Sequence, residues 1–154
     1  KLVYISRADS NNRKVINEVQ VINLLKNYNF EVVTLSDLSF KSQINLFNDS
    51  KIIVTMHGAS LTNLVFSPQE QTVIEMVPNY TKNKSNFYCD LSVSEFDNYL
   101  RIFFKKIAKI KKLNHFFLFC DYKATKTDNN KEQFTLTDIV VDIDLLNQII
   151  QKIL

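Results

Sequence analysis

The sequence predicts an α/β domain of Rossmann-like type, with a mostly parallel sheet flanked by helices. Short apolar runs alternate along the chain with segments whose apolar residues recur at helical spacing. The connections between them are short, which favours parallel strands joined by helical crossovers. In addition, the 154 residues contain a single glycine, Gly58, directly after one apolar run. We therefore expect a single domain over residues 1–154 with a special backbone position at that strand end.

The first 78 residues are expected to form four strands and three helices. The expected strands cover residues 2–6, 30–35, 51–55 and 72–77. The expected helices cover residues 12–28, 39–47 and 60–66. Asp9 or Ser10 is positioned to cap the first helix, and Ser39 to begin the second. The apolar stripe expected for the first helix is Val15, Val19, Ile22 and Leu25.

The second half of the chain continues the alternation less regularly. Residues 79–90 are polar and predict an irregular loop, and residues 94–112 predict a long amphipathic helix. Residues 115–122 predict a fifth strand, and the charged segment 123–133 predicts another loop. A closing helix should begin at Asp142 or Asp144 and end at Leu154.

Composition limits the function classes only loosely. The net charge of +3 does not favour nucleic acid, and no apolar stretch approaches the ~18 residues of a spanning helix. Cys89 and Cys120 belong to no metal-binding or disulfide motif. The chain begins with Lys1 inside a strand-like run, so we expect it to be part of a longer protein.

Gly58 lies within His57-Gly58-Ala59-Ser60-Leu61-Thr62-Asn63, after the run Ile52–Met56. Either the backbone there adopts a conformation closed to other residues, or another group approaches it closely. A strand end, a glycine and a helix N-terminus together form an arrangement that binds phosphate through free backbone N–H groups. The motif therefore predicts a phosphate-binding turn.

Several segments together resemble one family. They are Ile5-Ser6-Arg7, Arg13 with Ile16-Asn17-Glu18, Leu38-Ser39 with Gln43-Ile44 and Leu46-Phe47, the segment from His57 to Asn63 with Phe66, and Val73-Ile74-Glu75. In this order and spacing, residues 2–78 resemble the carboxy-terminal half of family 61 glycosyltransferases. That family includes capsular-polysaccharide enzymes of microbes, plant xylosyltransferases and animal N-acetylglucosaminyltransferases. One position departs from the family pattern, because Ser60 stands where the family usually has a second glycine.

The resemblance implies an enzyme of GT-B type, in which this chain is the half that binds the nucleotide-sugar donor. It implies inverting transfer in polysaccharide or glycan synthesis, independent of a metal or other cofactor, from a donor that is usually a UDP-sugar. The expected partners are the donor, a glycan or lipid-linked acceptor, and the N-terminal half of the same protein. The expected location is the cytoplasm or the periphery of the cytoplasmic membrane of a microbe.

Two arginines near the start are candidates for the donor diphosphate. Arg7 follows the first strand, where open α/β sheets place their ligands, and its planar fork suits phosphate. Arg13 is expected in the first turn of the next helix, where an anion would offset its unfavourable interaction with the helix dipole. Asn17, one turn later, is expected to contact phosphate or a sugar hydroxyl, or else to be simply solvated. Glu18 would orient Arg13 or be exposed.

His57 is the strongest candidate, as a hydrogen-bond donor to a phosphate or to the nucleotide. Gly58 and Ala59 belong to the expected phosphate-binding turn, in which Ser60, Leu61, Thr62 and Asn63 would offer backbone N–H groups. Thr62 or Asn63 would add a side-chain bond, whereas helix capping alone would explain Ser60. Glu75 lies in the apolar strand Val73–Val77, and a carboxylate there would bind a ribose diol or, on an edge strand, face water. The general base is not identified and is expected in the other half of the protein.

Two further patterns have simpler interpretations. Asp142-Ile143-Asp144 resembles the Asp-x-Asp of metal-dependent transferases but precedes an apolar helix, so it predicts an N-cap and no metal site. The lysine-rich segment 101–112 would contact an anionic membrane, or else be the solvated face of a helix on the core.

Two other functions are consistent with the sequence. The chain could be a non-catalytic nucleotide-binding or assembly module, which would bind nucleotide without transfer. It could instead be a nucleic-acid or membrane module based on the basic helix, whose binding would depend strongly on salt. By itself, the chain is expected to be catalytically inactive.

Overall fold

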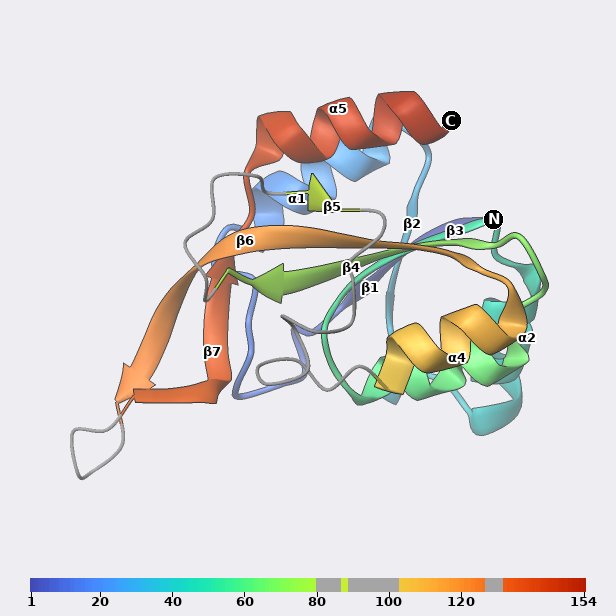
Figure 1. Cartoon of the computed structure of the whole chain (residues 1–154), viewed down its shortest axis with the longest axis horizontal. Coiled ribbons are helices and arrows are strands. Elements are labelled where there is room, and N and C mark those ends of the chain that lie inside the picture. The colour runs from blue at the N-terminus through green and yellow to red at the C-terminus, as the bar shows by residue number, and fades with distance from the viewer. Residues whose placement is uncertain (80–86, 89–102, 127–131) are drawn as a thin grey trace.

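A computed structural model describes residues 1–79, 87–88, 103–126 and 132–154 (Figure 1). These residues form a sheet of seven strands in a mostly parallel arrangement, so the predicted α/β fold is confirmed. The strands are β1 (Leu2–Ser6), β2 (Glu31–Thr34), β3 (Ile52–Met56), β4 (Thr72–Pro78), β5 (Phe87–Tyr88), β6 (Asn114–Lys126) and β7 (Glu132–Val140).

The helices lie between the strands, as the alternating pattern predicts. They are α1 (Glu18–Lys26), the short 3₁₀ segment η1 (Leu35–Asp37), α2 (Phe40–Asp49), the 3₁₀ helix η2 (Ala59–Phe66), α4 (Phe103–Lys111) and α5 (Ile143–Ile153). Two expected caps are confirmed: Ser39 accepts a hydrogen bond from Ser42 N, and Asp142 accepts one from Leu145 N. Asp142 therefore has the structural role that the sequence indicates.

The strand order is β2-β1-β3-β4-β6-β5, with β7 paired to β6. The chain passes from β1 to β2 on one side and then to β3 on the other, and all three strands are parallel. The direction of winding therefore reverses between β1 and β3. In open α/β sheets, ligands bind at such a switch point, beyond the carboxyl ends of the strands.

Helices cover both faces of the sheet (Figure 1). On one face, α1 and α5 pack over a core that contains Tyr4, Val54 and Met76. On the other face, α2, η2 and α4 pack over a second core that contains Val3, Ile53 and Val73. Because successive strand residues point to opposite faces, β1, β3 and β4 are buried on both sides, which explains their continuous apolar runs.

The first helix is shorter than predicted. It begins at Glu18 instead of residue 12, because Val15 forms a parallel bridge with Ile139. Its buried residues are Val21 and Leu25, whereas Val19, expected in the stripe, is 72% exposed. A strand contact from far along the chain thus overrides a helical pattern that continues into this segment.

The expected loop 123–133 is also partly wrong. Residues up to Lys126 continue β6, and β7 begins at Glu132, so the two strands form an antiparallel pair. The expected loop 79–90 and the first part of the expected helix 94–112, with Arg101 and Cys89, lie largely outside the described residues.

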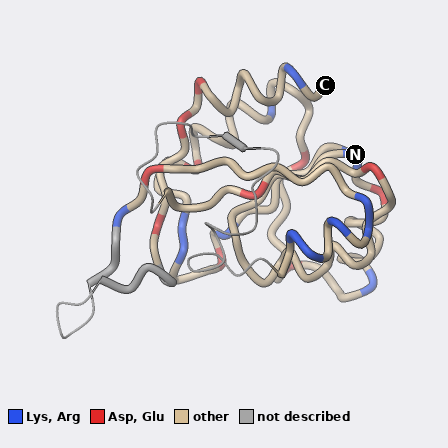
Figure 2. The backbone as a smooth tube through the Cα atoms, viewed as in Figure 1, with Lys and Arg blue, Asp and Glu red and all other residues tan. Residues whose placement is uncertain are grey.

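α4 is the described part of the lysine-rich segment. Phe104 and Ile107 pack on the core beneath it, while Phe103 and Ile110 are exposed. Figure 2 shows its lysines as blue segments along the helix. No helix in the described ranges has the length and apolar character needed to cross a membrane. Membrane contact through α4 stays a prediction.

Candidate functional site

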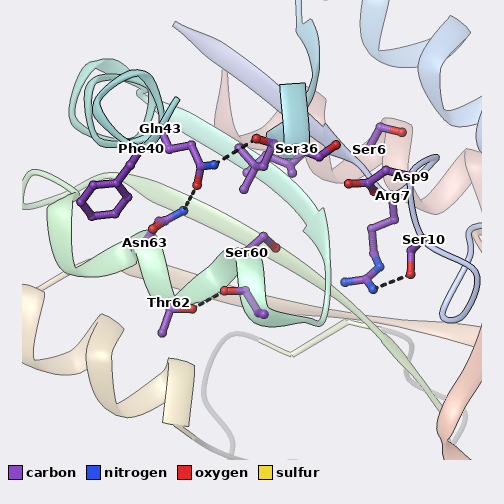
Figure 3. A pocket seen from close by; sticks show the side chains of 13 residues that line it. Ser6, Arg7, Asp9, Ser10, Ser36, Phe40, Gln43, Ser60, Thr62 and Asn63 are labelled. Atoms are coloured by element: carbon purple, nitrogen blue, oxygen red, sulfur yellow. Dashed lines mark hydrogen bonds between the residues drawn. The ribbon is translucent and has the colours of Figure 1, made fainter. Parts of the chain in front are cut away.

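A pocket of about 520 Å³ opens at the switch point, beyond the carboxyl ends of β1 and β3 (Figure 3). Its size is typical of sites that hold small molecules. The lining residues are Ile5, Ser6, Arg7, Asp9, Ser10, Leu35, Ser36, Phe40, Gln43, Ala59, Ser60, Thr62 and Asn63.

One end of the pocket is cationic. Arg7 Nη2 donates to Ser10 Oγ at 3.0 Å, and Arg7 Nε is buried with no hydrogen-bond partner among the described residues. Burial lowers the pKa of Arg7, and the nearby charge of Arg13 lowers it further, while Asp9 acts in the opposite direction. In the described part of the chain, no carboxylate lies within ion-pair distance of either arginine. Two neighbouring guanidinium groups without a carboxylate partner fit an anionic ligand.

Arg13 lies in a loop and not in a helix, which corrects the sequence prediction. Its φ of 57° is in the left-handed region that few residues other than glycine adopt. Its Nε is also buried without a partner among the described residues. The unfavourable helix-dipole interaction expected for Arg13 therefore does not arise, and the argument for an anion rests on the two adjacent arginines.

Gly58 explains how Arg7 is placed. Its backbone is extended (φ 169°), a conformation that any residue can adopt, so a left-handed turn is not the reason for glycine. A Cβ at this position would overlap Arg7 Nη1 and lie 3.3 Å from Arg7 Cζ. Of the two explanations that the sequence left open, the structure supports the close approach of another group. That group is the guanidinium of Arg7.

The first turn of η2 borders the same end of the pocket. Ala59 and Ser60 begin the helix, and the first N–H groups of a helix have no acceptor within it. Ser60 Oγ is buried without a hydrogen-bond partner among the described residues, and Thr62 Oγ1 donates to Ala59 O. The Thr62 hydroxyl proton is thus already used, whereas Ser60 keeps its hydroxyl for another group.

The other end of the pocket is aromatic and amide-lined (Figure 3). Phe40 is 66% exposed, and its ring meets Phe66 edge to face at 5.9 Å. Gln43 Nε2 donates to the carbonyls of Leu35 and Leu38, so its oxygen must face Asn63, whose Nδ2 donates to it at 3.0 Å. This network fixes the Asn63 amide and leaves its Oδ1 without a bond among the described residues.

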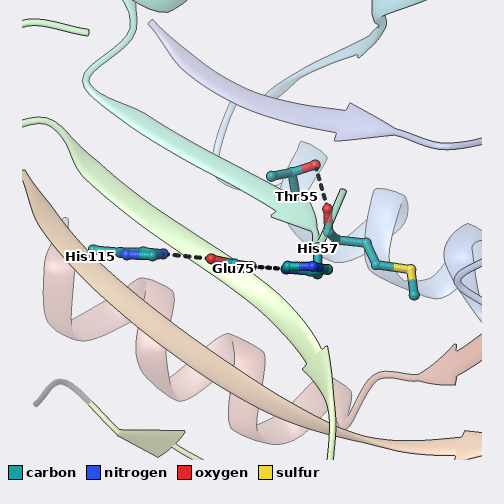
Figure 4. Close-up of polar contacts among 5 residues, drawn as sticks. Thr55, His57, Glu75 and His115 are labelled. Atoms are coloured by element: carbon teal, nitrogen blue, oxygen red, sulfur yellow. Dashed lines mark hydrogen bonds and ion pairs between the residues drawn. The ribbon is translucent and has the colours of Figure 1, made fainter. Parts of the chain in front are cut away.

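His57, which immediately follows β3, does not line this pocket. Its Nδ1 is hydrogen-bonded to Glu75 Oε1, and the other carboxylate oxygen accepts from His115 Nε2 at 2.8 Å (Figure 4). The three side chains come from the end of β3 and from neighbouring strands β4 and β6. The imidazole of His57 is 17% exposed and packs edge-on against Phe104 of α4 at 5.4 Å.

Glu75 is the centre of this cluster and is 2% exposed. Burial by itself would raise the pKa of its carboxyl group, but the hydrogen bonds from His115 and His57, and their charges, outweigh burial and lower it. Both carboxylate oxygens are therefore occupied in an ionised group. Because of this arrangement we do not retain the ribose contact that the strand position indicated for Glu75.

Asn17 is engaged in holding the fold together. It precedes α1 as its N-cap residue, and its Nδ2 donates to Val141 O at 2.8 Å and to Gln20 Oε1 at 3.2 Å. Its Oδ1 accepts from Val141 N at 2.9 Å. Glu18 accepts from Tyr4 and Ser6 and forms no ion pair with Arg13 among the described residues. We therefore propose no ligand contact for Asn17.

The structure thus brings together Arg7, Ala59, Ser60, Thr62 and Asn63 in one pocket, with Gly58 directly behind Arg7. The contributors that sequence reasoning missed include Ser10, Phe40 and Gln43 in the pocket and His115 beside Glu75. A hydroxyl three residues after Arg7 and an amide three residues after Phe40 were visible in the sequence, but neither is distinctive. His115 could have been noticed as a polar residue that begins an apolar strand.

Within the part of the chain that the structure describes, no group of three or more His, Cys, Asp or Glu side chains is arranged to hold a metal ion. The histidines at Glu75 are bonded to the carboxylate itself. The expectation of a metal-independent reaction stays a prediction.

Comparison with known proteins adds to this geometry. Residues 1–74 match the sequence model of the family described as glycosyltransferase 61, which confirms the predicted resemblance to this family. That the match is to the carboxy-terminal half of such enzymes stays a prediction. Protein O-linked-mannose beta-1,4-N-acetylglucosaminyltransferase 2 of Mus musculus is 32% identical over 79 residues, which are 49% of this chain and 13% of that protein. EGF domain-specific O-linked N-acetylglucosamine transferase of Gallus gallus is 33% identical over 85 residues, 52% of this chain and 15% of that protein.

Each of these relatives is much longer than this chain, which covers less than a sixth of either. The matched residues 1–74 contain β1, β2, β3, η2 and the described pocket, and stop just before Glu75.

Proposed function

We propose that this chain, whose residues 1–74 match the glycosyltransferase 61 family, is the donor-binding part of an inverting glycosyltransferase that uses a nucleotide sugar. The observation that carries the proposal is the pocket at the sheet's switch point, which Arg7 lines. Arg13 lies near Arg7, and neither arginine has a carboxylate partner in the described residues. The switch point is where an open α/β sheet binds a nucleotide, and the charge of the pocket matches a diphosphate.

The two ends of the pocket match the two ends of a nucleoside diphosphate. The diphosphate would bind Arg7, Arg13 and the first backbone N–H groups of η2, with Ser60 Oγ as an added donor. The nucleobase would stack on the exposed ring of Phe40 and meet the fixed amide of Asn63. Asn63 then contacts the base and not the phosphate. UDP is the nucleotide to test first.

In inverting transfer, an acceptor hydroxyl attacks the anomeric carbon as the bond to the nucleoside diphosphate breaks. The hydroxyl proton goes to a base, and negative charge grows on the departing diphosphate. Arg7, which lines the pocket, and the nearby Arg13 would stabilise that charge without a metal ion. The general base would come from residues outside this chain.

Further partners follow from this proposal. The acceptor would be a glycan or a lipid-linked sugar, presented by an N-terminal half of the same protein. The names of both relatives specify N-acetylglucosamine, so UDP-N-acetylglucosamine is the first complete donor to assay. We propose a location in the cytoplasm or at the cytoplasmic membrane.

An amide-resolved NMR titration with UDP tests the proposal. We expect saturable shifts at Arg7, Phe40 and the segment 58–63, and at least a tenfold weaker affinity in Arg7→Gln. Lys26→Gln is the matched control, since it removes an equal charge at an exposed position of α1. An affinity equal in all three chains, or no saturable shift with UDP, GDP or CMP, would contradict the donor site.

The second candidate is a nucleotide-binding module without catalysis. It predicts the same NMR shifts on titration with UDP. Only an assay of sugar transfer by the longer protein therefore separates the two functions. An assay with UDP-N-acetylglucosamine and Arg7→Gln as the impaired variant would decide. Nucleotide binding without any turnover of nucleotide sugars would favour the module.

A further inference from the structure

We propose that Glu75 and His115 are positioning residues for His57, which directly precedes Gly58 and lies outside the pocket lining, and that they fix its imidazole with a proton on Nδ1. Nε2 is then the nitrogen that meets the bound diphosphate. This inference rests on the proposed function and adds to it two residues that lie beyond the family match.

The first step is the ionised state of Glu75. A buried carboxylate is stable only when its oxygens accept hydrogen bonds, and both oxygens of Glu75 do so, one from each histidine. Since an ionised carboxylate only accepts, each histidine must donate. His57 therefore carries a proton on Nδ1, and His115 carries one on Nε2.

The second step is the difference between the two histidines. His115 Nδ1 is buried without a partner among the described residues, so a proton there would be an unpaired buried donor. His115 is consequently the fixed neutral donor. His57 is partly exposed, and its Nε2 has no hydrogen bond to a described residue. Of the two rings, only that of His57 can take a second proton without leaving an N–H unpaired.

The third step is the location of His57. It precedes Gly58 in the chain, and the Arg7 guanidinium occupies the space that a Gly58 Cβ would take, so one residue separates His57 from the contact with Arg7. A diphosphate held by Arg7 would lie near Gly58, the residue after His57, whose ring is outside the pocket lining. With Nε2 protonated, His57 would donate to a phosphoryl oxygen, and the buried charge of Glu75 would balance the imidazolium.

Long-range ¹H–¹⁵N spectra of the histidine rings test this directly in the 154-residue chain. We expect His57 protonated on Nδ1 and His115 on Nε2 without ligand, and His57 Nε2 to shift toward its protonated value as UDP saturates. In Glu75→Gln the amide can accept from only one histidine. His115 should keep that bond, because its other nitrogen is buried, and His57 should change to the Nε2–H tautomer.

Two variants separate positioning from simple loss of structure. His115→Gln keeps a side-chain N–H donor for Glu75 and should preserve the His57 tautomer and UDP affinity. Glu70→Gln alters an exposed carboxylate and should change neither. Glu75→Gln should weaken UDP at least tenfold, with the backbone amide spectrum otherwise retained.

The outcomes are distinguishable. His57 with its proton on Nε2 in the unmodified chain overturns the inference. A UDP affinity that falls in Arg7→Gln but not in Glu75→Gln also overturns the inference. That result would still support the proposed donor site. The absence of any saturable response to UDP overturns the proposed function and this inference together.

Discussion

Gly58 and Arg7 form a pair in which one residue makes room for the other. The guanidinium lies against the glycine Cα, in space that a Cβ would occupy. Since the Gly58 backbone is extended, the fold itself does not require glycine there. The single glycine of the chain is therefore explained by the position of a side chain in the pocket and not by a turn.

Gly58→Ala should accordingly change binding without harming the fold. The new methyl group displaces the end of the flexible Arg7 side chain, and we expect UDP affinity to fall about tenfold, or about 1.4 kcal/mol. The extended backbone accepts alanine, so the free energy of unfolding should stay equal or rise by about 0.4–1 kcal/mol. Calorimetric titration and urea unfolding measure the two effects. A loss of stability with unchanged affinity would contradict this explanation.

Aromatic stacking gives a second prediction at this scale. Phe40→Leu should weaken UDP more than inorganic pyrophosphate, because only UDP carries a base to stack. The expected loss is about 1–3 kcal/mol for UDP. Val65→Leu changes another exposed apolar residue, outside the pocket, and serves as the control. Equal losses for UDP and pyrophosphate would show that Phe40 does not contact the base.

The sequence predicted the location of those residues that directly follow a parallel strand. Arg7, Ser60 and Asn63 follow strands whose ends meet at one edge of the sheet, so their shared pocket follows from topology. The partners of Glu75 did not follow, because its bond to His115 depends on β4 and β6 being neighbours. The order of strands in the whole sheet makes β4 and β6 neighbours, and no pattern in the nearby sequence indicates this order.

At the scale of elements, the segment before α1 is held by the end of the chain. Lys14 N donates to Asp138 Oδ1 at 2.7 Å, Ile16 N donates to Ile139 O at 2.8 Å, and Asn17 bonds both backbone groups of Val141. These contacts join residues about 124 positions apart. The loop that carries Arg7 and Arg13 is thus held at its end by β7 and by Val141, the residue that follows β7.

Asn17→Ala should therefore destabilise the chain. It removes a side chain whose amide bonds Val141 twice and leaves those backbone groups in need of partners. We expect a loss of about 1–3 kcal/mol in the free energy of unfolding, measured by urea denaturation. Asn23→Ala, at an exposed position of α1, should change it by less than about 0.5 kcal/mol. Similar values for both variants would rule out a clamping role for Asn17.

The elements that the sequence predicted correctly are those with strong local patterns. The apolar strands, the Ser39 cap and the Asp142 cap all depend on neighbours within a few residues. The start of α1 was missed because it depends on contacts between residues 14–17 and 138–141, and the strand β7 was missed because it depends on pairing with β6. Alternation in Phe134-Thr135-Leu136-Thr137 was nevertheless a signal for β7.

At the scale of the whole molecule, the cluster of His57, Glu75 and His115 links the end of β3 to β4 and β6. It also makes the free energy of unfolding depend on pH. The folded-state pKa of Glu75 lies below its ordinary value of 4.5. Its contribution is therefore fully present above pH 4.5 and is lost as pH falls through the lowered folded value.

Urea unfolding of the original chain and Glu75→Gln from about pH 6 to about pH 3 measures this contribution. We expect the original chain to be the more stable of the two at the upper pH and the difference to narrow as the pH falls. The difference in stability between the original chain and Glu70→Gln should not narrow in this way as the pH falls. A difference that stays constant over the whole range would mean that the Glu75 carboxyl is not stabilised as an anion.

The clamp between residues 14–17 and the end of the chain also has a consequence for the order of folding events. Contacts between residues so distant in sequence close a very long loop, and such closure is slow compared with the formation of local turns and helices. The arginine loop receives its supports only when β7 reaches Val15. The ability to bind an anion should therefore return last during refolding, after the sheet that carries the pocket has already formed.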